Sequence, residues 1–479
     1  MKETGRPGTA ILSCAWNALC VLSHRDSGSA SRSQERYRRA ALSGITAVAS
    51  KLVSIGTSLL TVRLTYRYLG AERYGMWLTI SAFVLMLNFA DFGMSNGLIN
   101  LVADSLGRDN RVAAKQAISS AFWMLSGISL ILTVLVASTY PFVNVSRLFN
   151  VHSDLAVHEA GLSALALLAC FIVNLPLGTV RGTQTGMQNA ASNNLWGMTG
   201  TIASLVGLLF AIHLRAGLPV LILSLSVPPI LALLFNGVAL FGGEERDLAP
   251  GPSAINRDTA LLMLRVGATY FVLQLAISIG MQTDNVVIAQ IMGPTAVADY
   301  AVPARLFSLV NNVLIMLSGS MWPAYADAVA RKDAEWVRRS FLRVSIAGAV
   351  FTVFAVFVLM ICGNRILAIW VGPQMTATPL LLAVFGVQCM VYAYLQPIGF
   401  LLNGTAQYRV QAICATCMAV LNLGLSILFV KYLGIVGAVL GTVIAQLMVQ
   451  VVPLTLVTRQ VLQSLPQSFE AEAQERSAI

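Results

Sequence analysis

The sequence has little charge for its length. Only 11% of its 479 residues are Asp, Glu, Lys or Arg, whereas 57% are hydrophobic. A soluble domain carries about 25% charged residues and places them on its surface, so a water-soluble fold is excluded. With a mean hydropathy of +0.74, the composition indicates an all-α protein that crosses a membrane many times.

The chain also lacks the motifs of nucleotide and metal sites. It has no Walker A lysine motif, and no G-x-G-x-x-G follows a strand pattern. Cys414 and Cys417 form a C-x-x-C without a second pair or a nearby His, and His152 and His158 are typical of a solvated loop. We therefore expect no cofactor, no metal and no catalytic residues.

Apolar segments recur along the chain after residue 40. A hydrocarbon core of about 30 Å needs about 20 helical residues, so the pattern predicts about twelve transmembrane helices. We expect a disordered cytoplasmic tail at 1–40 and a second cytoplasmic tail at 458–479. The helices are expected at 41–62, 76–99, 117–140, 160–180, 196–214, 218–241, 264–291, 298–322, 341–362, 377–400, 411–431 and 434–457.

The basic residues predict the orientation. The 31 Lys and Arg outnumber the 21 Asp and Glu, and most of them fall in loops on the same side of the membrane as the N-terminus. Cytoplasmic loops carry the excess of Lys and Arg, so both termini are expected in the cytoplasm. The exception is a basic cluster just after the first helix, on the opposite side, which consists of Arg63, Arg67 and Arg73.

The two halves of the sequence repeat each other. Leu69–Gly70 matches Met292–Gly293 at an offset of 223 positions, and Ala103–Asp104 matches Ala326–Asp327 at the same offset. Because six helices per half return the chain to the same side, the repeat predicts two lobes related by a pseudo-two-fold axis along the membrane normal. The expected lobes are 41–241 and 259–457, joined by a Gly- and Pro-rich linker at 242–258 that suits a flexible cytoplasmic tether.

Polar residues inside the predicted helices mark candidate sites, because ionisable groups in a membrane usually face a cavity or a partner. The first helix carries a Ser/Thr stripe with Lys51 beside it, and the seventh carries Tyr270 and Gln274, which lies 223 positions after Lys51. We expect the two stripes to line one hydrated cavity between the lobes. The small polar residues could equally serve close helix packing, and that explanation also fits Gly93 and Gly97.

Other charged residues have two explanations each. Arg63, Arg265 and Arg305 either face the cavity or extend to the lipid headgroups. Asp91 and Asp284 lie within predicted spans, and transporters use such carboxylates as proton relays. We predict that one of these two acids couples transport to a cation gradient.

Two stretches resemble a known family. L-G-A-E-R-Y-G at Leu69–Gly75 and F-A-D-F-G-M-S-N-G at Phe89–Gly97 are similar to the bacterial polysaccharide flippases of the multidrug/oligosaccharidyl-lipid/polysaccharide exporter superfamily. The resemblance covers about residues 40 to 460. It implies a MATE-like V-shaped pair of bundles in the bacterial inner membrane that moves an undecaprenyl-diphosphate-linked oligosaccharide by alternating access, for O-antigen, capsule or exopolysaccharide synthesis. The family's cationic lumen would correspond to Lys51, Arg63 and Arg265.

Three functions compete. A flippase needs Lys or Arg for the diphosphate and polar side chains for sugar hydroxyls, which the stripes supply. A cation-coupled multidrug exporter of the same fold needs carboxylates and aromatic rings for its cation, and Lys51 argues against it. A glycosyltransferase or polymerase needs a large loop with acid, base or metal ligands, and we find no loop that long.

The sequence therefore predicts a flippase and not an enzyme. Its expected partners are a lipid-linked oligosaccharide, membrane lipid, H⁺ or Na⁺, and other polysaccharide-assembly membrane proteins, but no nucleic acid. The substrate cavity is expected to contain Lys51, Arg63, Arg265, Tyr270, Gln274 and Arg305.

Overall fold

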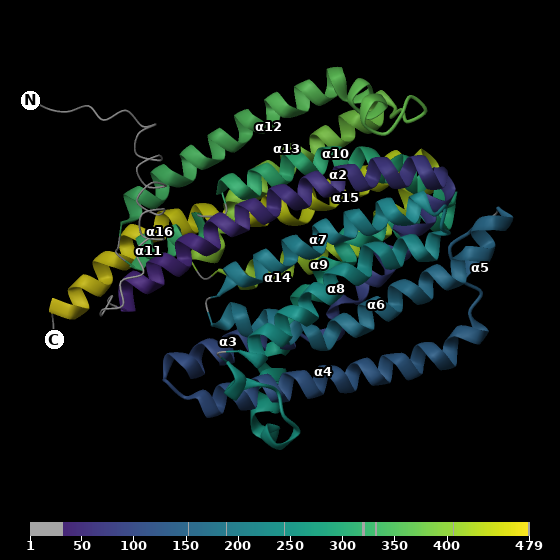
Figure 1. Ribbon diagram of the computed structural model, residues 1–479. Helices are drawn as coiled ribbons and strands as arrows, with labels where there is room; N and C mark the ends of the chain where they lie inside the picture. Colours follow the sequence, from purple (N-terminus) through teal and green to yellow (C-terminus); the bar gives the residue numbers. More distant parts are fainter. Residues whose placement is uncertain are drawn as a thin grey trace, which may run out of the picture.

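The computed structural model describes residues 32–477 except 152, 188, 244, 319–320, 331–332 and 406. Within these residues the chain is almost entirely helical and contains no strand (Figure 1). Residues 1–31 of the tail expected at 1–40 lie outside the described residues. The helices are α2 (Arg32–Met86), α3 (Met94–Gly107), α4 (Arg111–Thr139), α5 (Val145–Leu148), α6 (Asp154–Gly186), α7 (Ala190–His213), α8 (Leu218–Gly242), α9 (Arg257–Met292), α10 (Pro294–Ser318), α11 (Met321–Ala330), α12 (Ala334–Trp370), α13 (Pro379–Gly404), α14 (Tyr408–Leu433), α15 (Ile435–Gln446) and α16 (Val452–Ser477).

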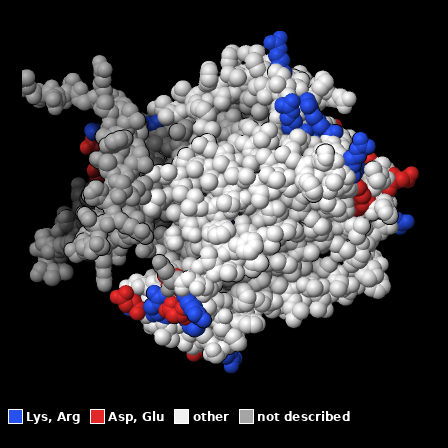
Figure 2. Space-filling model, viewed as in Figure 1, with Lys and Arg blue, Asp and Glu red and all other residues white. Residues whose placement is uncertain are grey.

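The long helices lie side by side in an elongated bundle (Figure 1). We name its ends after two short helices, the α3 end and the α5 end. Nine helices in the described part of the chain are long and apolar enough to span a membrane, and the count of twelve stays a prediction. Figure 2 shows a broad uncharged face with Lys, Arg, Asp and Glu gathered towards the ends. The chain is therefore a multi-pass membrane protein whose helices satisfy their own backbone hydrogen bonds.

Two glycine bends reproduce the sequence repeat in the backbone. Gly70 has φ 75° and ψ 174°, and Gly293 has φ 87° and ψ 169°. The expected loop between the first two helices is wrong, because α2 continues through residues 63–75 and only changes direction at Gly70. Glycine adopts positive φ without the steric cost that a Cβ imposes, so both halves reverse direction at the α5 end without a loop.

Positive φ recurs at two further pairs of corners. Asn150, after α5, is followed 222 positions later by Gly372, after α12. Arg215, after α7, is followed 219 positions later by Gly434, after α14. These offsets are close to the 223 of the sequence repeat, which supports the proposed division into lobes at 41–241 and 259–457.

A second bend interrupts the helix expected at 76–99. A 3₁₀ turn spans Leu87–Asp91, and Gly93 takes a left-handed conformation before α3 begins. Gly97 then packs against α9, where a Cβ would lie 3.0 Å from Met263 Cγ. The close helix approach expected at Gly93 and Gly97 is confirmed at Gly97, whereas Gly93 forms the turn before α3.

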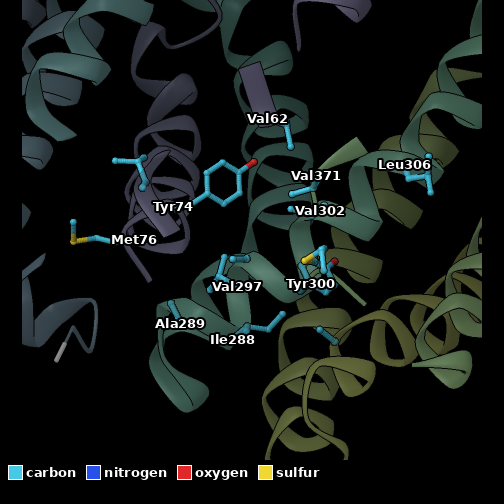
Figure 3. Close-up of a cluster of buried hydrophobic side chains, with 14 of the residues drawn as sticks. Val62, Tyr74, Met76, Ile288, Ala289, Val297, Tyr300, Val302, Leu306 and Val371 are labelled. Atoms are coloured by element: carbon cyan, nitrogen blue, oxygen red, sulfur yellow. The ribbon is translucent and has the colours of Figure 1, made fainter. Parts of the chain in front are cut away.

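The two halves meet at the α5 end. A cluster of buried hydrophobic side chains there includes Val62 and Tyr74 of α2, Ile288 of α9 and Val302 of α10 (Figure 3). Gly75 lies directly against the Pro294 carbonyl, with no space for a Cβ. Since Gly75 and Pro294 directly follow the two bends, the halves are joined here through backbone contact.

The basic cluster after the first helix ties helix ends together. Arg73 forms a bidentate ion pair with Glu159 of α6, with both N–O distances 2.7 Å and side chains 16% and 10% exposed. Glu159 Oε1 also accepts a hydrogen bond from Leu218 N at the start of α8, at 3.1 Å. Arg67 Nε donates to the Val371 carbonyl after α12, at 2.8 Å. Two of the three arginines therefore have structural partners at the α5 end.

The linker is not a free tether, contrary to the expectation from its Gly and Pro content. Arg111 of α4 forms ion pairs with Glu245 and Asp247, and Leu248 is completely buried. The linker also reaches two serines of α4, because Gly251 N donates to Ser119 Oγ at 3.2 Å and Asn256 N to Ser120 Oγ at 3.1 Å. Side chains of α4 thus hold the linker against the N-terminal half. The composition of the linker does not reveal these contacts, because their partners lie elsewhere in the chain.

We predict that Arg73→Met lowers the free energy of unfolding by about 3 kcal/mol, because it leaves Glu159 as an unpaired buried carboxylate. Thermal unfolding of the purified protein in detergent measures the loss. Arg108→Gln is the control, because it removes only an exposed i,i+4 pair with Asp104 worth about 0.5 kcal/mol or less. Equal melting shifts in the two variants would contradict the structural role of Arg73.

We also predict that Arg111→Gln releases the linker and speeds its amide hydrogen exchange. The Arg111 guanidinium lowers the pKa of Asp247 below its ordinary 3.8. Because the pKa is lowered, the ion pair stabilises the docked linker fully at any pH above the ordinary pKa. That stabilisation is lost as the pH falls through the lowered pKa. Linker protection should therefore be flat near neutral pH and decline only in strong acid. Arg246→Gln, in the same linker, is the control and should leave exchange unchanged; faster exchange in both variants would refute the assignment.

Candidate functional site

Lys51 and Arg305 lie along one face of α2. Lys51 is half-buried and makes no hydrogen bond or ion pair with any residue that the structure describes. Ser58 lies seven positions later, two helical turns or about 10 Å along the same face. Arg305 of α10 donates to Ser58 Oγ from Nε, at 3.1 Å, and from its terminal nitrogen. One cation from each half of the chain therefore lies on this face.

The small polar residues of α2 serve both of the explanations considered for them. Thr57 Oγ1 donates to the Val53 carbonyl of its own helix at 2.7 Å, which hides its polarity. Thr46 Oγ1 likewise donates to the Leu42 carbonyl at 2.7 Å, but it also accepts a hydrogen bond from Asn194 of α7, at 3.2 Å, and so joins two helices. Helix packing therefore accounts for part of the stripe, while Lys51 has no such role.

The other predicted cavity residues are not gathered on this face. Arg63 is exposed, and its neighbours on α2 face the end of α12, where Trp370 Nε1 donates to the Leu59 carbonyl at 2.8 Å. Arg265 is exposed in the first part of α9. The side chains of Tyr270 and Gln274 lie outside those that the structure describes. The cavity expected between the first and seventh helices stays a prediction; the structure shows that α2, which spans the first expected helix and the start of the second, packs against α9.

Asp284 lies inside a buried polar cluster built from four helices. Its Oδ2 accepts from Tyr300 Oη at 3.0 Å and lies 3.1 Å from Thr442 Oγ1, and its Oδ1 lies 3.1 Å from Ser426 Oγ. Both hydroxyls of Thr442 and Ser426 are also within hydrogen-bond distance of Asn422 Oδ1, at 3.0 and 3.1 Å. All five side chains are buried. The cluster therefore places a carboxylate among neutral oxygen atoms in the interior of the C-terminal half.

Asp91 occupies a different setting. It is buried at the turn between α2 and α3, where its Oδ1 accepts from Gly93 N at 2.9 Å. The next residue, Phe92, stacks on Phe271 of α9, with ring centroids 5.3 Å apart. The carboxylate of Asp91 thus holds a turn that packs on α9.

Sequence reasoning missed the partners of Glu159 and Asp284. Glu159 lies just before the helix expected at 160–180 and gave no signal of its pairing with Arg73. Around Asp284, the signal was visible in part, since Asn422 and Ser426 are one helical turn apart in a segment that is otherwise apolar. Their meeting with Asp284 depends on how α9 and α14 pack, which local pattern does not report.

The family model and the curated relatives that match this chain are named for polysaccharide biosynthesis or O-antigen export. A family profile described as "Polysaccharide biosynthesis protein" matches residues 43–329, more than half of the chain. A Yersinia pseudotuberculosis protein named for O-antigen export is 22% identical over 292 residues, which is 59% of this chain and 64% of that protein. A Salmonella typhimurium protein named as an O-antigen transporter is 19% identical over 419 residues, 83% of this chain and 91% of that protein. The chain thus spans under two thirds of the Yersinia relative.

Solved structures share the fold. An inward-facing multidrug resistance MATE transporter of the MOP superfamily matches with a TM-score of 0.73 and 18% identity, over 87% of this chain and 96% of that one. The lipid II flippase MurJ, in an inward closed conformation, matches with a TM-score of 0.69 and 15% identity, over 89% of this chain and 90% of that one. The named relatives and structures are exporters, transporters and a flippase, and none is an enzyme. This chain is a multi-pass membrane protein that belongs to the polysaccharide biosynthesis protein family and has the fold of the MATE and MurJ transporters.

Proposed function

We propose that the protein flips an undecaprenyl-diphosphate-linked oligosaccharide across the bacterial inner membrane by alternating access. Its family and the O-antigen export names of its relatives support a polysaccharide substrate. The fold shared with a lipid II flippase supports a lipid-linked one. Both termini lie in the cytoplasm in this proposal, so the α3 end is the cytoplasmic end.

The single observation that carries the proposal is the pair of cations on the Lys51 face. A diphosphate brings negative charge into a region where charge is costly, and Lys or Arg side chains offset that cost through charge-assisted hydrogen bonds. Lys51 has no described partner, and Arg305 is held by a neutral hydroxyl. Both cations therefore retain their capacity to bind an anion, while nearby hydroxyls suit sugar.

The multidrug-exporter alternative has less support. Such a protein needs a carboxylate exposed to its cationic cargo. Asp284 is instead enclosed by the hydroxyls of Tyr300, Ser426 and Thr442, and Asp91 holds a turn. Neither acid lies on the Lys51 face.

The place where the halves are joined supports the proposed alternating access. The Gly75–Pro294 contact and the two glycine bends close the α5 end. In the proposed cycle the lobes rock about the substrate, as repeat-based transporters do. The lipid-linked oligosaccharide would bind from the cytoplasm before the two lobes separate at the α5 end. It would be released on the far side of the membrane after they separate.

The Asp284 cluster is the proposed coupling site. A carboxylate with neighbouring hydroxyl and amide oxygens is the donor set that hard cations prefer, and the same carboxylate can instead take a proton. Its ligands come from α9, α10, α14 and α15, so a cation there would bear on how these helices pack. Asp91 accepts a backbone hydrogen bond in a turn, so it serves as the control acid for the proposed coupling role of Asp284.

We predict that Lys51→Ala reduces glycan export by about ten- to a hundredfold, the cost of one lost charge-assisted contact. Lys51→Arg should keep part of the activity. Surface glycan is measured in cells that lack their own flippase, with membrane insertion checked for each variant. Arg147→Ala, an exposed change at the α5 end, is the matched control. Export at the control level by Lys51→Ala would exclude the proposed anion site.

We predict further that Asp284→Asn abolishes the response of transport to a cation gradient, because the amide can neither take a proton nor supply the charge that a cation needs. Transport is followed in vesicles with the Na⁺ or H⁺ gradient intact or collapsed. Asp91→Asn should still respond to the gradient. An Asp284→Asn variant that responds as the unchanged protein does would show that coupling lies elsewhere.

A further inference from the structure

A cavity lies between α12, α13 and α16, away from the Lys51 face. Its volume is about 500 Å³, within the range of about 300–1,000 Å³ that ligand pockets occupy. In Figure 1, α12 lies along the edge of the bundle and α16 at the end that carries the C-terminus. Leu342, Val353 and Met390 of the groove's lining are exposed, so the groove opens to the outside of the C-terminal half. Most of the side chains that line it are apolar, among them Phe341, Leu342, Val353, Met390, Ile398 and Leu462.

One face of α16 gives the groove a polar corner. Thr455, Thr458 and Arg459 are spaced i, i+3 and i+4, and all three line the cavity. The Thr455 hydroxyl is satisfied, since it donates to the Val451 carbonyl at 2.5 Å and lies 2.8 Å from Tyr394 Oη. Together, these three residues place a cation and two hydroxyls beside the apolar part of the groove.

Thr458 is the unusual member of this corner. Its side chain is 4% exposed, yet its hydroxyl has no hydrogen-bond partner among the residues that the structure describes. A threonine in a helix ordinarily donates to the carbonyl four positions earlier, as Thr455 does. A buried hydroxyl without a partner is costly, so a ligand that accepts its hydrogen bond would remove that cost.

The helix itself is built to present this corner. A π-helical turn at Leu447–Val451 connects α15 to α16. Such a turn inserts an extra residue and rotates the face of the helix that follows it, and it occurs often at functional sites. Here the rotation brings Thr458 and Arg459 against α12 and α13.

We propose that this groove binds one anionic glycerophospholipid of the surrounding membrane. One acyl chain of the lipid fills the apolar part of the groove. The lipid phosphate pairs with Arg459, and an ester carbonyl of the lipid accepts a hydrogen bond from the Thr458 hydroxyl. The charge favours an anionic headgroup, because Arg343 follows the groove residue Leu342 on α12 and adds positive charge at the same end. The lipid would link α16 to α12 and α13 at a site separate from the transported substrate.

Native mass spectrometry of the purified full-length protein tests the proposal. The protein is supplied with phosphatidylglycerol or with phosphatidylcholine of the same acyl chains. We expect one phosphatidylglycerol per chain, retained about tenfold more strongly than phosphatidylcholine, because both lipids carry the phosphate but the choline ammonium of phosphatidylcholine offsets its charge beside Arg459. Arg459→Gln should remove the preference, and Arg409→Gln, an exposed arginine on α14 that does not line the groove, should keep it.

Two further variants test the apolar part of the groove and the hydroxyl. Ala349→Phe, which places a ring in the groove, should reduce retention of both lipids. Thr458→Val should weaken the retention of phosphatidylglycerol and of phosphatidylcholine to a similar extent, because both lipids carry the ester carbonyl. Equal retention of the two lipids by the unchanged protein would overturn the proposal. Full retention of phosphatidylglycerol by Arg459→Gln, or of either lipid by Ala349→Phe, would also overturn it.

Discussion

A hydrocarbon environment offers no hydrogen-bond partners, and this constraint shapes every part of the structure. The chain satisfies its backbone through long helices, and it changes direction at Gly70 and Gly293 without exposing a loop. Charges inside the protein follow the same rule. Arg73 and Glu159 satisfy each other, and three hydroxyls surround Asp284. A charged side chain that escapes this pairing, such as Lys51, is therefore informative about what the protein binds.

The two ends of the bundle have different mechanical roles. At the α5 end, the contact of Gly75 with Pro294 joins the halves through backbone, and Arg67 adds a hydrogen bond to the end of α12. At the α3 end, the linker is bound to α4 and ends at Asn256, which caps α9 with its side chain. In the proposed rocking motion the linker would therefore move with the N-terminal half. A rocking motion of the lobes would have to be absorbed by α9 itself rather than by the linker.

Composition and periodicity predicted the features that depend on local sequence. The membrane class and the close approach at Gly97 follow from short stretches of sequence, and the equivalent bends at Gly70 and Gly293 follow from comparing the two halves directly. Features that depend on distant partners did not follow. The Gly and Pro content of the linker suggested flexibility, because nothing local shows that Arg111, Ser119 and Ser120 hold it. Likewise, Asp284 was identified as a buried acid, but the residues around it come from helices far away in the sequence.

The central claim is that a cationic face between the halves carries a diphosphate-linked glycan. Transport by the purified protein in sealed vesicles tests it most directly, with a fluorescent polyprenyl-diphosphate oligosaccharide on one side and a glycan-cleaving enzyme on the other. The account predicts that the oligosaccharide becomes accessible to the enzyme only when the protein is present, and that a cationic dye in matched vesicles is not moved. Movement of the dye without movement of the oligosaccharide would contradict it.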